Sequence, residues 1–175
     1  LKVAAIVGLM RHVGMEGVAA AMDQFAKLRD STEPNQRILA ARILGDIEIQ
    51  NFYRPLLPLL RDENLDVRYE ALIAAGKLKN PRLWPDALAA LNMPNVQSAA
   101  MSALVEAGPA VLPLIEQTFE DQTTQPELRV RLIRILQQIR GERVVAFLER
   151  HMEMAHHSVY LRLLYALSAC HYHAS

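Results

Sequence analysis

Apolar residues recur along the chain at steps of three and four, in segments of roughly ten to sixteen residues. This spacing places them on one face of an α-helix. The two-residue alternation of a half-buried strand is absent from the sequence, and β-branched and aromatic residues are sparse. The apolar segments are interrupted at Pro, Gly, Asn and Asp. The pattern therefore predicts an all-α protein.

The segment 66–78 shows this pattern most clearly, and related segments occur at regular intervals. Its apolar and small positions, which begin at Val67, are matched by segments that begin at residues 36, 96, 128 and 159. The steps between the five copies are 31, 29, 32 and 31 residues. A nearly constant period of this length is the signature of a repeat protein.

A second set of helices, marked by proline, is expected between these copies. Pro55, Pro85 and Pro113 stand at matching places, and proline is tolerated in the first turn of a helix. Each repeat is thus a first helix, A, followed by a second helix, B. We expect one domain over residues 1–175, built from these repeats: 1–13 (partial), 16–48, 52–79, 82–108, 110–140 and 142–171. Such a unit cannot bury its apolar face alone, so neighbouring repeats must stack.

Local signals predict how the B helices begin and pack. Asp66 and Asn95 stand where an N-cap residue would accept hydrogen bonds from free backbone amides. Gly45 and Gly76 share one register, although a glycine inside a helix costs about 1 kcal/mol relative to alanine. Close packing between helices A and B is the expected reason, and the alanines of segment 66–78 favour the same short distance.

The segment 66–78 resembles a HEAT repeat, through Asp66-Val67-Arg68, the small residues after it and the preceding Leu-Leu-Pro-Leu-Leu at 56–60. The resemblance is strongest over residues 52–79 and covers nearly the whole chain. It implies a right-handed α-solenoid of about five stacked two-helix repeats, with the B helices lining a concave face. Proteins of this family mostly bind other proteins. Some relatives are enzymes, including bilin lyases and a DNA glycosylase, and similar runs occur as cytoplasmic segments of bacterial membrane proteins that resemble nucleotide transporters.

Composition and charge argue against several classes of protein. The 175 residues contain 19 Lys and Arg and 19 Asp and Glu, so the net charge of zero gives no electrostatic footprint for nucleic acid. The single cysteine, Cys170, excludes an intrachain disulfide and fits a reducing, cytoplasmic location. The longest apolar run, Val3 to Met10, is shorter than the roughly 20 residues of a membrane span. Because the chain starts at Leu1 and not at Met, we expect it to be part of a longer protein.

A row of long polar side chains forms the candidate binding site. Five residues share one register at the start of successive B helices: Arg37, Arg68, Gln97, Arg129 and Tyr160. On the concave face they would contact a protein partner. In the alternative interpretation each Arg braces the stack, by pairing with an acid such as Asp66 or by bonding a helix end.

The sequence contains no motif for phosphate-loop, dinucleotide, serine-hydrolase or zinc-protease chemistry. We therefore expect no enzyme activity, no catalytic residue and no cofactor. Five histidines fall in the last 25 residues, namely His151, His156, His157, His171 and His173, but their spacing does not favour a metal site. The carboxylate pairs Asp62-Glu63 and Glu120-Asp121 are expected in turns before B helices, where they favour the positive helix end.

Together these observations predict a non-catalytic scaffold for protein–protein interaction. Its partner would be another protein or another domain of the same chain, within a larger intracellular or membrane-associated protein. The apolar residues Leu1, Val3, Ala4 and Ile6 would allow end-to-end contact through the first repeat. A HEAT-like lyase or other cofactor-handling enzyme, and a nucleic-acid-binding HEAT protein, are the alternatives.

Overall fold

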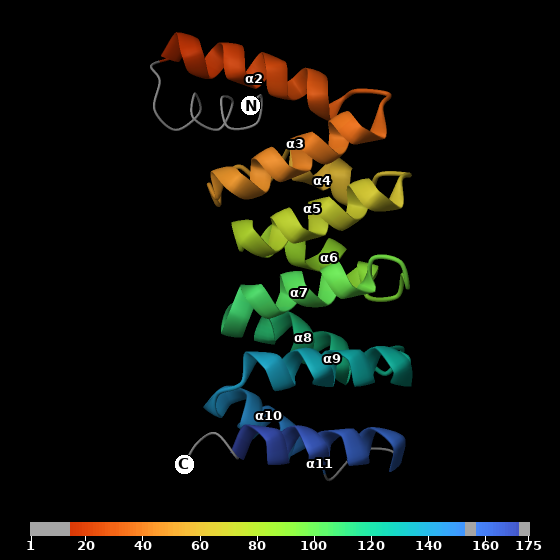
Figure 1. The fold of residues 1–175 in the computed structure, drawn as a ribbon. Helices are drawn as coiled ribbons and strands as arrows, with labels where there is room; N and C mark the ends of the chain where they lie inside the picture. The colour runs from red at the N-terminus through yellow and green to blue at the C-terminus, as the bar shows by residue number, and fades with distance from the viewer. Residues whose placement is uncertain (1–14, 153–156, 172–175) are drawn as a thin grey trace. The chain divides into compact units, whose positions relative to one another are not determined.

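The structure is a computed structural model that describes residues 15–152 and 157–171 (Figure 1). This described part is built from α-helices and short 3₁₀ turns, without a strand, which confirms the predicted all-α solenoid class. The chain divides into two compact units, Leu1–Ala103 and Leu104–Ser175, and each is described by itself. The expectations of a single domain and of a right-handed superhelix stay predictions.

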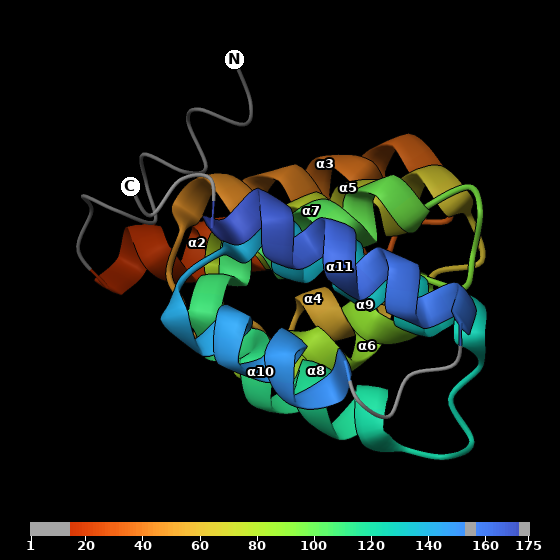
Figure 2. The ribbon, with the colours of Figure 1, turned by 90° about the horizontal axis from the view of Figure 1, so that it is seen from below.

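The first unit alternates A and B helices. Its A helices are α2 (Met15–Arg29), α4 (Leu56–Leu60) and α6 (Trp84–Ala90), the last preceded by the 3₁₀ turn η1 (Pro81–Leu83). Its B helices are α3 (Pro34–Ile47), α5 (Leu65–Leu78) and the first part of α7 (Gln97–Ala107). Figures 1 and 2 show α3 beside α5, with α4 in a second layer.

The second unit repeats this arrangement. After α7 come the 3₁₀ turn η2 (Gly108–Val111) and the helices α8 (Leu112–Glu120), α9 (Pro126–Ile139), α10 (Glu142–Met152) and α11 (His157–His171). The B helices α9 and α11 lie side by side, and the A helix α10 packs against both (Figure 2).

The prolines mark the helix starts as predicted. Pro55 is the residue before α4, while Pro85 and Pro113 are the second residues of α6 and α8. Proline suits these places because the first backbone amides of a helix have no partner within it.

The predicted N-caps of the B helices are wrong. Helix α5 is capped by Asn64, whose side-chain oxygen accepts hydrogen bonds from the backbone N–H groups of Asp66, at 2.9 Å, and Val67, at 3.2 Å. Asp66 lies inside the first turn instead, where its charge still favours the helix dipole. Asn95 lies in the turn before α7, which begins only at Gln97.

Close packing at Gly45 is confirmed, but between two B helices and not between A and B. A Cβ atom at Gly45 would lie 3.2 Å from both Cα and Cβ of Ala74, which belongs to the next B helix. A contact of that length is tighter than ordinary van der Waals distance, so alanine does not fit here without a shift of backbone. The glycine therefore sets how closely α3 and α5 approach.

Each unit has its own apolar core. In the first unit, buried aliphatic residues of α3, α4 and α5 meet, including Ile43, Leu44, Leu56, Leu59 and Leu72. Trp84 is also buried, although its indole N–H has no hydrogen-bond partner among the described residues. In the second unit, Phe119 and Phe147 pack edge to face with their ring centroids 5.3 Å apart.

Within the described residues, one stretch, Gln97–Glu120, is long and apolar enough to cross a membrane, which the sequence analysis did not anticipate. The stretch consists of α7, η2 and α8, and it contains Gly108 with a positive φ of 64°. A buried core helix meets the same criteria, so this is weak evidence for a membrane span.

Several predictions fall outside the described residues. These are the partial repeat 1–13, the apolar contact residues Leu1, Val3, Ala4 and Ile6, and the histidines His156 and His173.

Candidate functional site

The residues of the predicted polar row bond the ends of their own A helices. Nε of Arg68 donates to the carbonyl oxygen of Asp62, and Nε2 of Gln97 donates to that of Leu91 at 3.1 Å. Arg129 donates to two carbonyl oxygens near the end of α8, those of Phe119 and Asp121, at 3.1 and 2.8 Å. These carbonyls lack partners within a helix, so the side chains act as C-terminal caps. Arg68 and Arg129 thus bond a helix end, as one form of the brace interpretation predicted, but within their own repeat, and Gln97 makes the same kind of bond.

Arg37 goes further and joins two repeats. Its guanidinium donates to both carboxylate oxygens of Asp62, in the A–B turn of the next repeat, at 2.6 and 2.8 Å. It also donates to the carbonyl oxygens of Ser31 and Thr32, at 2.9 and 3.0 Å. Both charged side chains are nearly buried, with 11% and 8% of their surface exposed. The acid that pairs with an Arg of this row is therefore Asp62, and the predicted partner Asp66 was wrong.

This pair also shifts the protonation of Asp62. Burial raises the pKa of its carboxyl, but hydrogen bonds from Arg37 and from the backbone N–H of Asn64 outweigh burial, so the pKa lies below its ordinary value. The pKa of Arg37 is raised, chiefly by the hydrogen bond to Asp62. Both groups are therefore charged at neutral pH.

The fifth member of the row, Tyr160, is half-buried in the first turns of α11. The structure does not gather the five residues into one site, since each stays at the start of its own B helix. Their role in partner binding stays a prediction, and the polar atoms of four of them already have partners within the chain.

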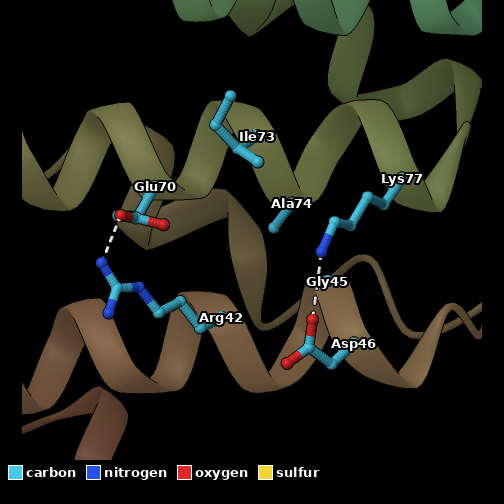
Figure 3. Close-up of a pocket in the computed structure, with 7 residues that line it drawn as sticks. All are labelled: Arg42, Gly45, Asp46, Glu70, Ile73, Ala74 and Lys77. Carbon is cyan, nitrogen blue, oxygen red and sulfur yellow. Dashed lines mark hydrogen bonds and ion pairs between the residues drawn. The ribbon is translucent and has the colours of Figure 1, made fainter.

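A hollow on the B-helix face lies elsewhere, between α3 and α5 (Figure 3). Its volume is about 220 Å³. The lining residues come from both helices: Arg42, Gly45 and Asp46 from α3, and Glu70, Ile73, Ala74 and Lys77 from α5. Gly45 and Ala74, which pack closely against each other, form its floor.

Two ion pairs of opposite polarity bound this hollow. Arg42 of α3 pairs with Glu70 of α5 at 2.6 Å, and Lys77 of α5 pairs with Asp46 of α3 at 3.0 Å (Figure 3). All except Glu70 are more than a third exposed. Ile73 supplies an apolar wall between the two pairs. The hollow thus combines a small apolar floor with a charged rim.

This hollow was not predicted, although the sequence contains charge pairs that indicate a contact between these two helices. Arg42 and Glu70 are 28 residues apart, and Asp46 and Lys77 are 31 apart, close to one repeat period. Opposite charges at that spacing lie side by side on stacked helices, so they predict contacts between repeats.

His151, in the second unit, is buried and packs against aromatic residues. The ring of His151 is buried against Phe147, with centroids 4.2 Å apart. Its Nδ1 lies 2.8 Å from the carbonyl oxygen of Phe147, and its Nε2 lies 3.2 Å from the carboxylate of Glu120, which also pairs with Arg150. The carboxylate of Asp121 accepts hydrogen bonds from the hydroxyl and the backbone N–H of Thr123, which lower its pKa. Among the described residues no group of three metal-binding side chains occurs.

Comparisons with known proteins agree with the repeat architecture. The family model for HEAT repeats matches residues 23–93. The matching solved structures include human deoxyhypusine hydroxylase in complex with glycerol, at 15% identity over 98% of this chain and 96% of that chain. Its TM-score of 0.37 is too low to support an argument about fold or function. A search of curated proteins gave no match. The likeness to nucleotide-transporter-like membrane proteins is unsupported, whereas residues 23–93 match the HEAT-repeat family, as their sequence predicted.

Proposed function

We propose that this chain is a non-catalytic scaffold that binds another protein, or another domain of its own chain, through its B-helix face. The observation that carries this proposal is the hollow between α3 and α5. HEAT repeats, the family matched by the residues that form it, mostly bind proteins. The partner-contacting surface would thus be centred on Ile73 and not on the row of capping residues.

The chemistry of the hollow suits a protein side chain. Gly45 and Ala74 pack closely at its floor, and the space of about 220 Å³ above them, with Ile73 in its lining, would take an apolar group. Protein interfaces commonly place an apolar centre inside a polar rim. The rim charges are already paired with one another, so the free protein leaves no charge unsatisfied there. An incoming apolar side chain therefore gains contact without separating the ion pairs.

The rim would also orient the partner. Positive charge comes from α3 at one end, through Arg42, and from α5 at the other, through Lys77. A partner segment that crosses the hollow meets this pattern in only one favourable direction. Complementary charge of this kind contributes more to specificity and to the rate of association than to raw affinity.

The non-catalytic part of the proposal rests on the same seven residues. None of them is a Ser, Cys or Thr next to a base, and each carboxylate of the hollow faces a cation. A nucleophile activated by a neighbouring base is the usual sign of covalent catalysis. A cytoplasmic setting within a larger protein completes the proposal, supported by the single cysteine, Cys170.

An exchange of charges tests the proposal. A photo-reactive residue at position 73 would first identify the partner by crosslinking in cells, and the affinity of the purified pair would then be measured. The double variant Arg42→Glu with Glu70→Arg retains an ion pair but reverses its polarity. We expect it to weaken binding at least about tenfold, because like charges would meet across the interface.

The matched control reverses a pair on the A helices. Arg61 and Asp86 pair at 2.7 Å between the end of α4 and α6, so Arg61→Asp with Asp86→Arg makes the same exchange away from the hollow. This control should leave affinity unchanged. Equal loss in both double variants, or none in the first, would show that the partner does not bind at the hollow.

A further inference from the structure

We propose that Tyr53, Arg54 and Arg82 form a binding site for an oxyanion of the phosphate-monoester class, at the turns that follow α3 and α5. The site lies apart from the hollow on the B-helix face, and it does not depend on the proposed function. Three observations support it: a hydrogen-bonded frame, a guanidinium stacked on the ring of Tyr53 beside a second arginine, and the lack of an acidic ion-pair partner for either arginine among the described residues.

The frame is a set of hydrogen bonds between the two turns. Nε2 of Gln50 donates to the carbonyl oxygen of Lys79 at 3.0 Å, and Nδ2 of Asn80 donates back to the carbonyl oxygen of Gln50 at 2.8 Å. The side-chain oxygen of Asn80 accepts from the backbone N–H of Arg82 at 3.0 Å. Asn80 is only 7% exposed, so its two bonds are partly shielded from water, whereas the bond from Gln50 to Lys79 is exposed. The turn before α4 and the turn η1 are therefore held as one unit.

On this frame the side chains of Tyr53 and Arg82 stack. The Cζ atom of Arg82 lies 5.4 Å from the centroid of the Tyr53 ring, a cation–π contact. A stacked guanidinium keeps its N–H groups free at the edges of its plane, so the contact orients the group without using its donors.

Arg54 approaches the same tyrosine from the neighbouring position in sequence. Hydrogen bonding with Arg54, together with the charges of Arg82 and Arg54, lowers the pKa of Tyr53 and outweighs the opposing effect of burial. Two cationic groups thus act on one hydroxyl, which becomes more acidic in their field. An oxygen that carries full negative charge would be favoured there more strongly.

Neither guanidinium has an ion pair among the described residues. Arg37, Arg42, Arg61 and Arg150 each pair with a carboxylate, whereas Arg54 and Arg82 are exposed and do not. Lys79 adds a third positive residue to these turns, and Glu48 is the acidic one. Among the described residues, no carboxylate forms an ion pair with these positive groups.

This arrangement matches a phosphate monoester. Guanidinium groups present parallel N–H donors that bind two oxygens of one oxyanion, and charge-assisted bonds of this type are short and strong. Two such groups suit an anion with three free oxygens and nearly two negative charges. The Tyr53 hydroxyl would donate a further hydrogen bond. Free phosphate and a phosphorylated side chain present the same chemistry.

Titration of the full chain by NMR tests the site. Inorganic phosphate and a short phosphoserine peptide are added separately at constant ionic strength, with chloride and the unphosphorylated peptide as blanks. We expect saturable shifts of the backbone amides of residues 53, 54 and 82 with both phosphate probes and not with the blanks. The probe that binds more tightly identifies the ligand. Tighter binding of the peptide indicates a phosphorylated partner protein, and tighter binding of inorganic phosphate indicates the free ion.

Substitutions of the three site residues show whether each contributes to phosphate binding. Arg54→Ala and Arg82→Ala should each weaken binding at least about tenfold, since a hydrogen bond to a charged group is lost. Tyr53→Phe keeps the stacking and should weaken binding only about three- to tenfold. Arg143→Ala removes an equally exposed arginine from α10 and should change nothing. Linear shifts without saturation, or equal loss in Arg143→Ala, would overturn the proposal, and circular dichroism checks that each variant is folded.

Discussion

Replacement of Asp62 by Asn removes the charge of the nearly buried ion pair with Arg37 and preserves the shape of the side chain. The amide oxygen of the variant still accepts the N–H of Asn64, which bonds Oδ1 of Asp62 at 2.9 Å in the native protein. What is lost is one of two charge-assisted bonds from Arg37, at 2.6 and 2.8 Å, and the opposite charge beside a guanidinium that is 11% exposed.

The magnitude follows from this environment. Removing one partner of a buried ion pair costs about 3–5 kcal/mol, because the other charge stays buried without compensation. Arg37 keeps the carbonyl oxygens of Ser31 and Thr32 as acceptors, which partly compensate its charge. We therefore expect Asp62→Asn to lower the free energy of unfolding by about 2–3 kcal/mol at neutral pH.

The assay is urea unfolding followed by circular dichroism at several pH values. The carboxyl of Asp62 has a lowered pKa in the folded protein, so its contribution is present above the unfolded value, at about pH 4. It is lost as the pH falls through the folded pKa. The difference between wild type and Asp62→Asn should consequently shrink below about pH 4.

An exposed ion pair provides the control. Arg61 is largely exposed in its pair with Asp86, so Asp86→Asn should cost under about 1 kcal/mol. If Asp62→Asn costs no more than this control, or if its effect does not change with pH, the pair between the repeats does not stabilise the fold as reasoned here.

Three further substitutions have expected outcomes, each measured as a change in the free energy of unfolding. Gly45→Ala should cost about 1 kcal/mol, because the new Cβ would lie 3.2 Å from Ala74 and this overpacking exceeds the gain in helix propensity. Adding Ala74→Gly to the same chain should relieve part of the loss. Asn64→Ala should cost about 1 kcal/mol, because the N-cap of α5 is lost, whereas Asp66→Ala should cost less than half as much. If Asp66→Ala costs more than Asn64→Ala, Asp66 is the N-cap and the assignment of Asn64 is wrong. Phe147→Ala should cost about 3–5 kcal/mol through the cavity left beside Phe119 and His151, and a loss under about 1 kcal/mol would contradict its place in the core.

The period of the sequence was sufficient to predict which segments form helices and where prolines begin them. It could not choose the N-cap of α5, because Asp62, Asn64 and Asp66 are all good capping residues within five positions. The choice is made by a tertiary contact. Arg37, 25 residues earlier, engages Asp62, and Asn64 is left to cap the helix.

The candidate site was harder to predict for a related reason. A repeat pattern relates equivalent positions in successive repeats, whereas some contacts join positions that are not equivalent. Gly45 has Gly76 as its equivalent, yet it packs against Ala74. The offset between them depends on the stagger of stacked helices, which a single repeat does not encode. The row at Arg37, Arg68, Gln97 and Arg129 was found because its members are equivalent, and its arginines bond an acid or a helix end, as the alternative interpretation predicted.

The hydrogen bonds made by the row of polar side chains have a consequence for the order of folding. The bonds of Arg68 to Asp62 and of Gln97 to Leu91 each span six residues, within a single A–B hairpin. Closing so short a loop costs little chain entropy, so these bonds can form before neighbouring repeats stack. A chain leaving the ribosome could therefore close each hairpin as soon as its B helix is complete. The longer bridge from Arg37 to Asp62 would then form last and join the finished hairpins.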